Sequence, residues 1–114
     1  MKNLTTNIFD PAMRHALNGS IAKWRGIVKG ELYDEGPDNC PLCQLYLYTT
    51  DCEGCPIAAD VQAKWCEKTP YGKVKADTTD KQMRKIAKKE LAYLIKLRAK
   101  LDKRRQRALK KNSV

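Results

Sequence analysis

The chain has 114 residues, and its 23 Lys or Arg outnumber its 13 Asp or Glu to give a formal net charge of +10. This length allows one domain with a modest core. The sequence contains no apolar run long enough to span a membrane, and residues 1–7 lack the apolar segment of a signal peptide. We therefore expect a protein of the reducing cytoplasm rather than a secreted or membrane-spanning one.

A long amphipathic helix is predicted near the start of the chain. Asp10-Pro11 is typical of a helix start, because the aspartate can cap the first turn and proline fits its first position. Gly30 is typical of a helix stop, so we expect the helix to run to about Lys29. The apolar residues between these signals recur at spacings of three and four and predict one buried face: Met13, Leu17, Ile21, Trp24 and Val28.

Two features near this helix are predicted to be solvated surface. His15, the only histidine, lies far from the cysteines in sequence and is expected on the outside of the helix rather than at a metal. The acidic segment 31–39 is expected to form a loop with Asp34, Glu35 and Asp38 in contact with water. Neither feature therefore enters the predicted site.

The cysteines are concentrated in one segment, which we expect to fold around a metal. All five lie between residues 40 and 66: Cys40, Cys43, Cys52, Cys55 and Cys66. Two Cys-x2-Cys pairs can each aim two sulfurs at one point, and four thiolates suit a tetrahedral Zn²⁺. An odd number of cysteines in a reducing location favours a metal over disulfides. We predict a structural Zn²⁺ site, with disulfides or an iron–sulfur cluster less favoured; the spacing leaves open which four cysteines bind.

Each cysteine pair is predicted to begin or flank a short helix. Cys40-Pro41 and Cys55-Pro56 place a cysteine just before a helix start, where the positive end of the helix favours a thiolate. Residues 45–48 fit a helix or a short strand equally well. The inner face of the second helix is predicted from a spacing of four: Ile57, Val61 and Trp65. Trp24 and Trp65 are both expected in the core, and Tyr71 is expected to cover the metal.

A second long helix is predicted to close the chain. Thr79 and Gln82 fit a capping box at its start. Its apolar face lasts about five turns: Met83, Ile86, Ala87, Leu91, Leu94, Ile95, Leu97 and Leu101. We therefore predict a single mainly α domain over residues 1–101, in which long N-terminal and C-terminal helices pack around a Cys-ligated zinc-knuckle module at 38–72. Residues 102–114 are expected to form a basic helical extension that frays toward Val114.

With these motifs in view, the sequence resembles a family of small five-cysteine bacteriophage proteins. The resemblance covers about residues 20–97, through the segments Ser20–Trp24, Cys40–Cys43, Asp51–Ile57, Thr69–Tyr71 and Lys89–Leu94. It implies a phage origin, the host cytoplasm and a compact cysteine-rich fold, and it brings no biochemical activity with it. The long basic extension departs from the family pattern, so a role for that extension is not implied by the resemblance.

The basic extension carries the functional prediction. Between Lys96 and Lys111, in this extension and the helical turns before it, nine cations stand against the single acid Asp102, and such an imbalance favours an anionic partner. The nine are Lys96, Arg98, Lys100, Lys103, Arg104, Arg105, Arg107, Lys110 and Lys111. We expect non-enzymatic binding of nucleic acid, DNA or RNA, through phosphates and with low sequence specificity. The alternative is a phage accessory or anti-defence inhibitor that binds an acidic surface of a host protein or nucleoprotein complex. The oligomeric state is left open.

Overall fold

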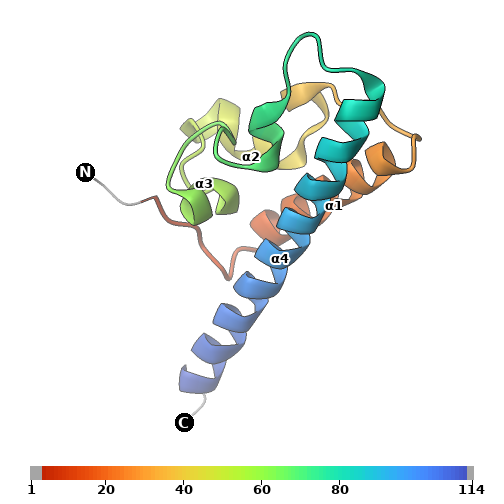
Figure 1. Cartoon of the computed structure of the whole chain (residues 1–114). Coiled ribbons are helices and arrows are strands. Elements are labelled where there is room, and N and C mark those ends of the chain that lie inside the picture. Colours follow the sequence, from red (N-terminus) through yellow and green to blue (C-terminus); the bar gives the residue numbers. More distant parts are fainter. Residues whose placement is uncertain (1–3, 113–114) are drawn as a thin grey trace.

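The computed structural model describes residues 4–112, with side chains up to residue 111. All the regular secondary structure in this range is helical (Figure 1). The four α-helices are α1 (Pro11–Val28), α2 (Pro41–Thr50), α3 (Pro56–Val61) and α4 (Asp80–Asn112). Two 3₁₀ turns, η1 (Gly36–Asn39) and η2 (Pro70–Lys73), lie between them. None of these helices is both long enough and apolar enough to cross a membrane. The predicted mainly α fold with two long helices is confirmed.

The capping interactions predicted from the sequence are present at the start of both long helices. The Asp10 carboxylate accepts a hydrogen bond from the Ala12 N–H at the start of α1. At the start of α4, Thr79 and Gln82 exchange reciprocal side-chain to backbone bonds of 3.0 and 3.2 Å. The residue after the α1 cap, Gly30, has a φ of +76°, which glycine adopts without strain.

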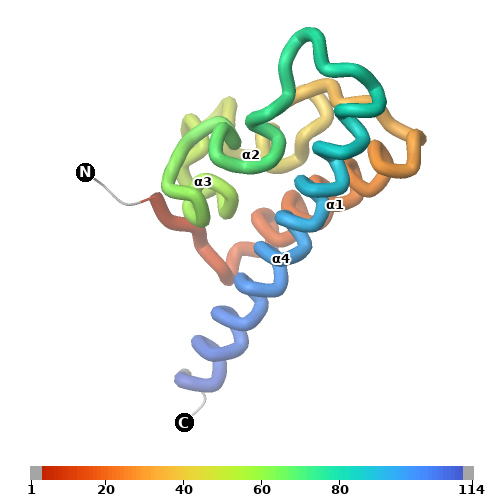
Figure 2. Tube along the Cα trace, in the orientation of Figure 1, coloured from red at the N-terminus to blue at the C-terminus, as the bar shows by residue number. Residues whose placement is uncertain are grey.

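The two long helices form the core of the protein. α1 packs directly on α4, α2 packs on α1, and α3 contacts α4. The trace in Figure 2 shows the cysteine-bearing segment, coloured yellow to green, gathered beside the pair of long helices. The largest share of the buried apolar side chains comes from α1 and α4: Met13, Leu17, Ile21, Trp24, Ile27, Ala87, Leu94, Leu97 and Leu101.

The last third of α4 leaves the body of the protein. Leu101 is the last buried residue of this helix among those described, and the helix then continues as regular helix to Asn112 (Figure 1). An ion pair between Arg14 and Asp102 marks the point of departure. The predicted basic extension is thus helical over 102–112, and the expected fraying toward Val114 lies outside the described residues.

Several local predictions are wrong or are now decided. Residues 45–48 belong to α2, so the strand alternative is excluded. α3 is shorter than its apolar spacing predicted, because Gln62 adopts a left-handed conformation and ends it at Val61. Trp65 consequently lies beyond the helix and is 57% exposed, whereas Trp24 is 4% exposed and in the core as predicted.

Gly19 lies in the middle of α1 where α2 approaches most closely. A Cβ atom built on it would lie 2.9 Å from Cγ of Pro41, closer than carbon atoms pack. We predict that Gly19→Ala destabilises the protein, because overpacking costs about 1–3 kcal/mol and outweighs a helix-propensity gain of about 1 kcal/mol. Chemical unfolding measures the free-energy change.

The matched control is Ala22→Gly on the exposed side of the same helix. It is expected to destabilise by about 1 kcal/mol through propensity alone. A Gly19→Ala protein more stable than the wild type would contradict the close contact between α1 and α2.

Candidate metal centre and basic helix

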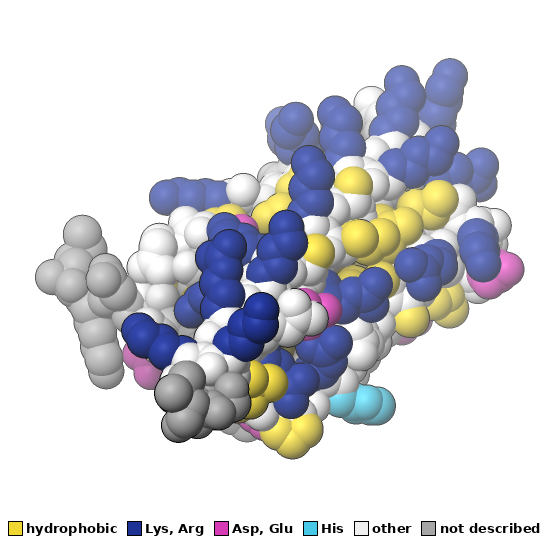
Figure 3. Space-filling model, turned by 90° about the horizontal axis from the view of Figure 1, so that it is seen from below, with side chains coloured by type: hydrophobic (Ala, Val, Ile, Leu, Met, Phe, Trp, Pro, Cys, Tyr) yellow, Lys and Arg dark blue, Asp and Glu magenta, His cyan; other side chains and the backbone are white. Residues whose placement is uncertain are grey.

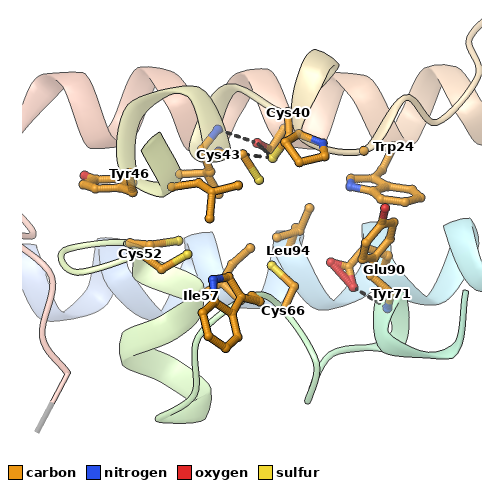
Figure 4. A pocket seen from close by; sticks show the side chains of 17 residues that line it. Trp24, Cys40, Cys43, Tyr46, Cys52, Ile57, Cys66, Tyr71, Glu90 and Leu94 are labelled. Carbon is orange, nitrogen blue, oxygen red and sulfur yellow. Dashed lines mark hydrogen bonds between the residues drawn. The ribbon is translucent and has the colours of Figure 1, made fainter. Parts of the chain in front are cut away.

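All five cysteines line one cavity. It has a volume of about 210 Å³. Figure 4 shows Cys40 and Cys43 on one side of it, where α2 begins, and Cys52 and Cys66 on the opposite side. The remaining walls are mainly apolar and aromatic side chains from α1, α2, α3, η2 and α4: Trp24, Leu42, Ile57, Tyr71 and Leu94. The fold therefore brings together every cysteine that the sequence predicted as a metal ligand.

The cysteines reach the cavity through two tight turns. Asp51 and Cys52 both have left-handed backbone, with φ of 53° and 70°, and so do Trp65 and Cys66, with φ of 65° and 60°. Non-glycine residues in this region are strained by roughly 1–3 kcal/mol each, and such strain gathers at functional sites. Each turn places one cysteine, Cys52 or Cys66, at the wall of the cavity.

The start of α2 holds a hydrogen-bonded pair of cysteines. The Cys43 N–H donates to the Cys40 sulfur at 3.3 Å, as expected for a cysteine at a helix cap. The hydrogen bond from the Cys43 side chain, helped by the Lys23 charge, lowers the pKa of Cys40 to about 6 although burial opposes this. The same bond and burial raise the pKa of Cys43. The Cys40 thiol thus loses its proton more readily than its partner Cys43.

The other helix cap does not behave in this way. Burial raises the pKa of Cys55 to about 11, although the N–H groups of Ala58 and Ile57 at the start of α3 act to lower it, as predicted for a helix start. Burial, with the nearby charges of Cys55 and Cys40, also raises the pKa of Cys66. Binding of a metal at this cavity must therefore displace protons from thiols and will strengthen as the pH rises.

The sulfurs face a shared space without meeting at one ion-sized point. Four thiolates on one Zn²⁺ at about 2.3 Å touch one another and leave no cavity. Within the range that the structure describes, no three histidine, cysteine or acidic side chains are gathered closely enough to hold a metal ion. The predicted zinc knuckle is therefore not preformed, and the cysteines surround a larger volume instead.

A buried ion pair lies behind Tyr71, one of the residues that line the cavity, and the sequence did not predict it. Lys23 Nζ lies 2.9 Å from Asp34 Oδ1, and these side chains are only 5% and 7% exposed. The other oxygen of Asp34 accepts a hydrogen bond of 2.9 Å from the Tyr71 hydroxyl. Tyr71 in turn packs edge-on against Trp24, with ring centroids 5.3 Å apart. The expectation that Asp34 is solvated is wrong, because it finds a buried lysine.

A carboxylate also faces the cavity from α4. Glu90 is 2% exposed, and its Oε1 accepts a hydrogen bond of 3.1 Å from the Tyr71 N–H. Burial raises the pKa of Glu90. Its position among apolar residues of α4 gave no sequence signal of a buried charge. His15, in contrast, is exposed on α1 as predicted and has no part in the cavity.

The nine predicted basic residues lie on α4, and eight of them are exposed. Arg98 is half-buried and donates to Asn18 at 3.1 Å, and Lys100 pairs with Asp60 at 2.8 Å. At about 100° per residue, seven of the nine fall in a sector of about 120°. The exceptions are Arg98 and Arg105, on the far side of the helix.

Two further lysines extend this face toward the start of α4. They were not predicted from the sequence, because the apolar pattern dominates that part of the helix. Lys85 and Lys89 are exposed and fall in the same sector as the seven. The resulting basic stripe comprises Lys85, Lys89, Lys96, Lys100, Lys103, Arg104, Arg107, Lys110 and Lys111.

No protein-family model, curated protein or solved structure matches this chain. No family is assigned. The resemblance to five-cysteine phage proteins, and the host cytoplasm that it implies, stay predictions from the sequence motifs. What the protein does has to be inferred from its own geometry and charge.

The buried ion pair makes a prediction about stability. Lys23→Met should destabilise the protein by about 3–5 kcal/mol, because it leaves the Asp34 carboxylate buried without its cation. Lys29→Met, on an exposed position just after the same helix, should change stability by less than about 0.5 kcal/mol. Equal effects of the two substitutions in chemical unfolding would contradict the burial of the pair.

The pair also sets the expected pH dependence. Burial acts to raise the pKa of Asp34, but the Lys23 bond and the other hydrogen bonds lower it below the usual 3.8. The stability contributed by this carboxylate is therefore present above the unfolded pKa and is lost as the pH falls through the lower folded value. Lys23→Met should lose that part of the acid dependence in unfolding experiments at decreasing pH.

Proposed function

We propose that this protein binds nucleic acid without enzymatic activity, through phosphate contacts made by the basic stripe of α4, and that a thiolate-bound metal in the cysteine cavity supports this helix. The observation that carries the proposal is the charge of the projecting end. Residues 103–111 hold six Lys or Arg and no acid. Phosphate binding by such a surface releases counterions and depends weakly on sequence.

The placement of the acids strengthens this inference. Asp102, the one acid near the projecting end, is paired with Arg14 of α1, and Asp60 is paired with Lys100. Figure 3 shows Lys and Arg side chains spread over this side of the molecule, with few acids among them. A surface that only maintains solubility mixes both signs, whereas this one presents a single sign along one helix.

The length of the stripe suits an extended polyanion. From Lys85 to Lys111 a helix advances about 39 Å at about 1.5 Å per residue. A straight row of cations of that length can follow several successive phosphates, and no recognised base-reading motif accompanies it. Low sequence specificity, with DNA and RNA both as possible ligands, is therefore part of the proposal.

In this proposal the metal stabilises α4 and does not contact the nucleic acid. Glu90 and Leu94 of α4 line the same cavity as the five cysteines, so a group bound there touches the helix that bears the stripe. Zn²⁺ is the metal that the sequence favours, because an all-thiolate set suits a structural zinc. Thiolate binding of a structural metal contributes folding free energy, on the order of 10–16 kcal/mol in zinc-finger peptides.

The second candidate is a phage accessory or anti-defence protein that binds a host protein or nucleoprotein complex. The exposed aromatic side chains favour it, since Tyr33, Tyr48 and Trp65 are all more than half exposed and such residues are enriched in protein interfaces. Capture of one defined host protein, together with negligible binding of generic DNA and RNA at low salt, would support this candidate over the first.

The stripe predicts a steep dependence of affinity on salt. Binding of duplex DNA should fall linearly on a log–log plot against salt concentration, with a slope of about −0.9 for each phosphate neutralised. Lys103→Gln with Arg107→Gln should reduce the size of that slope by about 2. Fluorescence anisotropy titrations at several salt concentrations measure both quantities.

Two controls carry the same change in net charge. Lys68→Gln with Lys75→Gln removes two exposed cations away from α4 and should leave the slope unchanged. Lys85→Gln with Lys89→Gln should reduce the slope if the whole stripe binds, and should leave it unchanged if only the projecting end does. Full affinity after loss of Lys103 and Arg107 would place the binding surface elsewhere.

Removal of the metal should unfold the protein cooperatively. A strong chelator under reducing conditions is expected to lower the helical signal in far-UV circular dichroism, because the cavity joins α2 and α3 to the two long helices. Elemental analysis of the same sample establishes that the metal has gone. An unchanged spectrum after complete removal would rule out a structural role for the metal.

A further inference from the structure

We infer that the cysteine cavity holds a polynuclear iron–sulfur cluster of the [4Fe–4S] type rather than a single zinc ion. This inference rests on the thiolate-bound metal of the proposed function and specifies its chemical class. It starts from the difference between a cavity ringed by thiols and a knuckle closed on one ion.

The arrangement of the sulfurs is the first argument. In a mononuclear site the four sulfurs touch, since each lies about 2.3 Å from the same ion. Here the thiols reach the cavity from opposite sides, with Cys40 and Cys43 facing Cys52 and Cys66 (Figure 4). No three potential ligands among the described side chains share an ion-sized point. A cluster meets this geometry because each of its irons takes its own thiolate at a separate corner.

The size of the cavity is the second argument. Its 210 Å³ exceeds the volume of about 150 Å³ that admits benzene in an engineered apolar cavity. A cubane core of eight atoms is a guest of comparable bulk. A zinc ion would occupy a small part of that space and would leave the facing thiols without contact.

The character of the walls is the third argument. Apart from the thiols, the lining is largely apolar and aromatic, with Trp24, Leu42 and Leu94 among its buried members. Such walls keep water from the inorganic sulfides. The Cys43 N–H at the start of α2 donates to the Cys40 sulfur, a contact that favours the negative charge of a thiolate-bound cluster.

The binding step balances as a ligand exchange. Two ferrous ions, two ferric ions and four sulfides form a core of charge 2+, and four thiols each lose a proton as four iron–thiolate bonds form. The complex then carries a charge of 2−. The chain offers five thiols for four irons, so one cysteine is spare.

The test is elemental and optical analysis of the full chain. Protein purified without oxygen, or its metal-free form treated with ferrous and ferric iron and sulfide, should contain four irons and four acid-labile sulfides per chain. It should show a broad visible absorption that dithionite bleaches. Zinc supplied in equal amount should not displace the iron. One zinc per chain with no sulfide, under both preparations, would overturn the inference.

Variants check the ligand set. Cys55→Ala leaves the four facing thiols and should retain the cluster, whereas Cys43→Ala with Cys66→Ala leaves three thiols and should lose most of the iron. Tyr48→Ala, on the exposed side of α2 and outside the cavity, should keep full iron content. Native mass spectrometry of the wild-type chain gives the same stoichiometry without relying on any variant to fold. Iron content that stays full in the double variant would count against thiolate ligation.

These outcomes separate this inference from the proposed function. One zinc per chain, together with unfolding by a chelator, would support the proposal that a metal stabilises α4 and would contradict only the iron–sulfur cluster. Lys103→Gln with Arg107→Gln should weaken DNA binding while the iron content stays unchanged. A cluster in a protein that binds no nucleic acid would instead uphold the site and refute the function of the stripe.

Discussion

The shortage of apolar side chains in the cysteine-bearing segment, residues 40–66, is the constraint on which the rest of this structure depends. The cysteine-bearing segment contributes few buried apolar residues of its own, chiefly Leu42, Ile57 and Ala58. Its five thiols surround a cavity instead of filling it. Packing alone would hold such a segment weakly, because each buried side chain contributes only about 1.5–3 kcal/mol. A bound inorganic group would supply the cohesion that the apolar residues lack.

α4 has two faces of different character. The face toward α1 is buried as far as Leu101, and the basic stripe lies about a third of a turn away around the same helix. The ion pairs of Arg14 with Asp102 and of Lys100 with Asp60 lie where the helix leaves the body. Both acids are paired within the protein, and the other cations of the stripe are exposed.

The sequence predicted those parts of the structure that depend on local signals. Both long helices were predicted from the caps at Asp10 and Thr79 and from the periodic apolar residues, since these signals act within a few residues. Trp65 was misplaced because its spacing matched a helix that Gln62 ends early. The pairing of Lys23 with Asp34 and the burial of Glu90 depend on which segments meet in space, and a charged residue shows no such partner in a linear pattern. The cysteine spacing predicted a shared site, but the width of the cavity is set by how the long helices pack.

The continuity of α4 links its two ends thermodynamically. No proline or glycine interrupts the helix between the wall of the cavity at Glu90 and the last cation of the stripe. Whatever binds at either end favours the same ordered helix, and linkage requires such an effect to be mutual. A polyanion on the stripe would then tighten the hold on the inorganic group by the same factor by which that group tightens the hold on the polyanion. Through this reciprocity, occupancy of the cavity at one end of an uninterrupted helix would change the affinity for a polyanion at the other end.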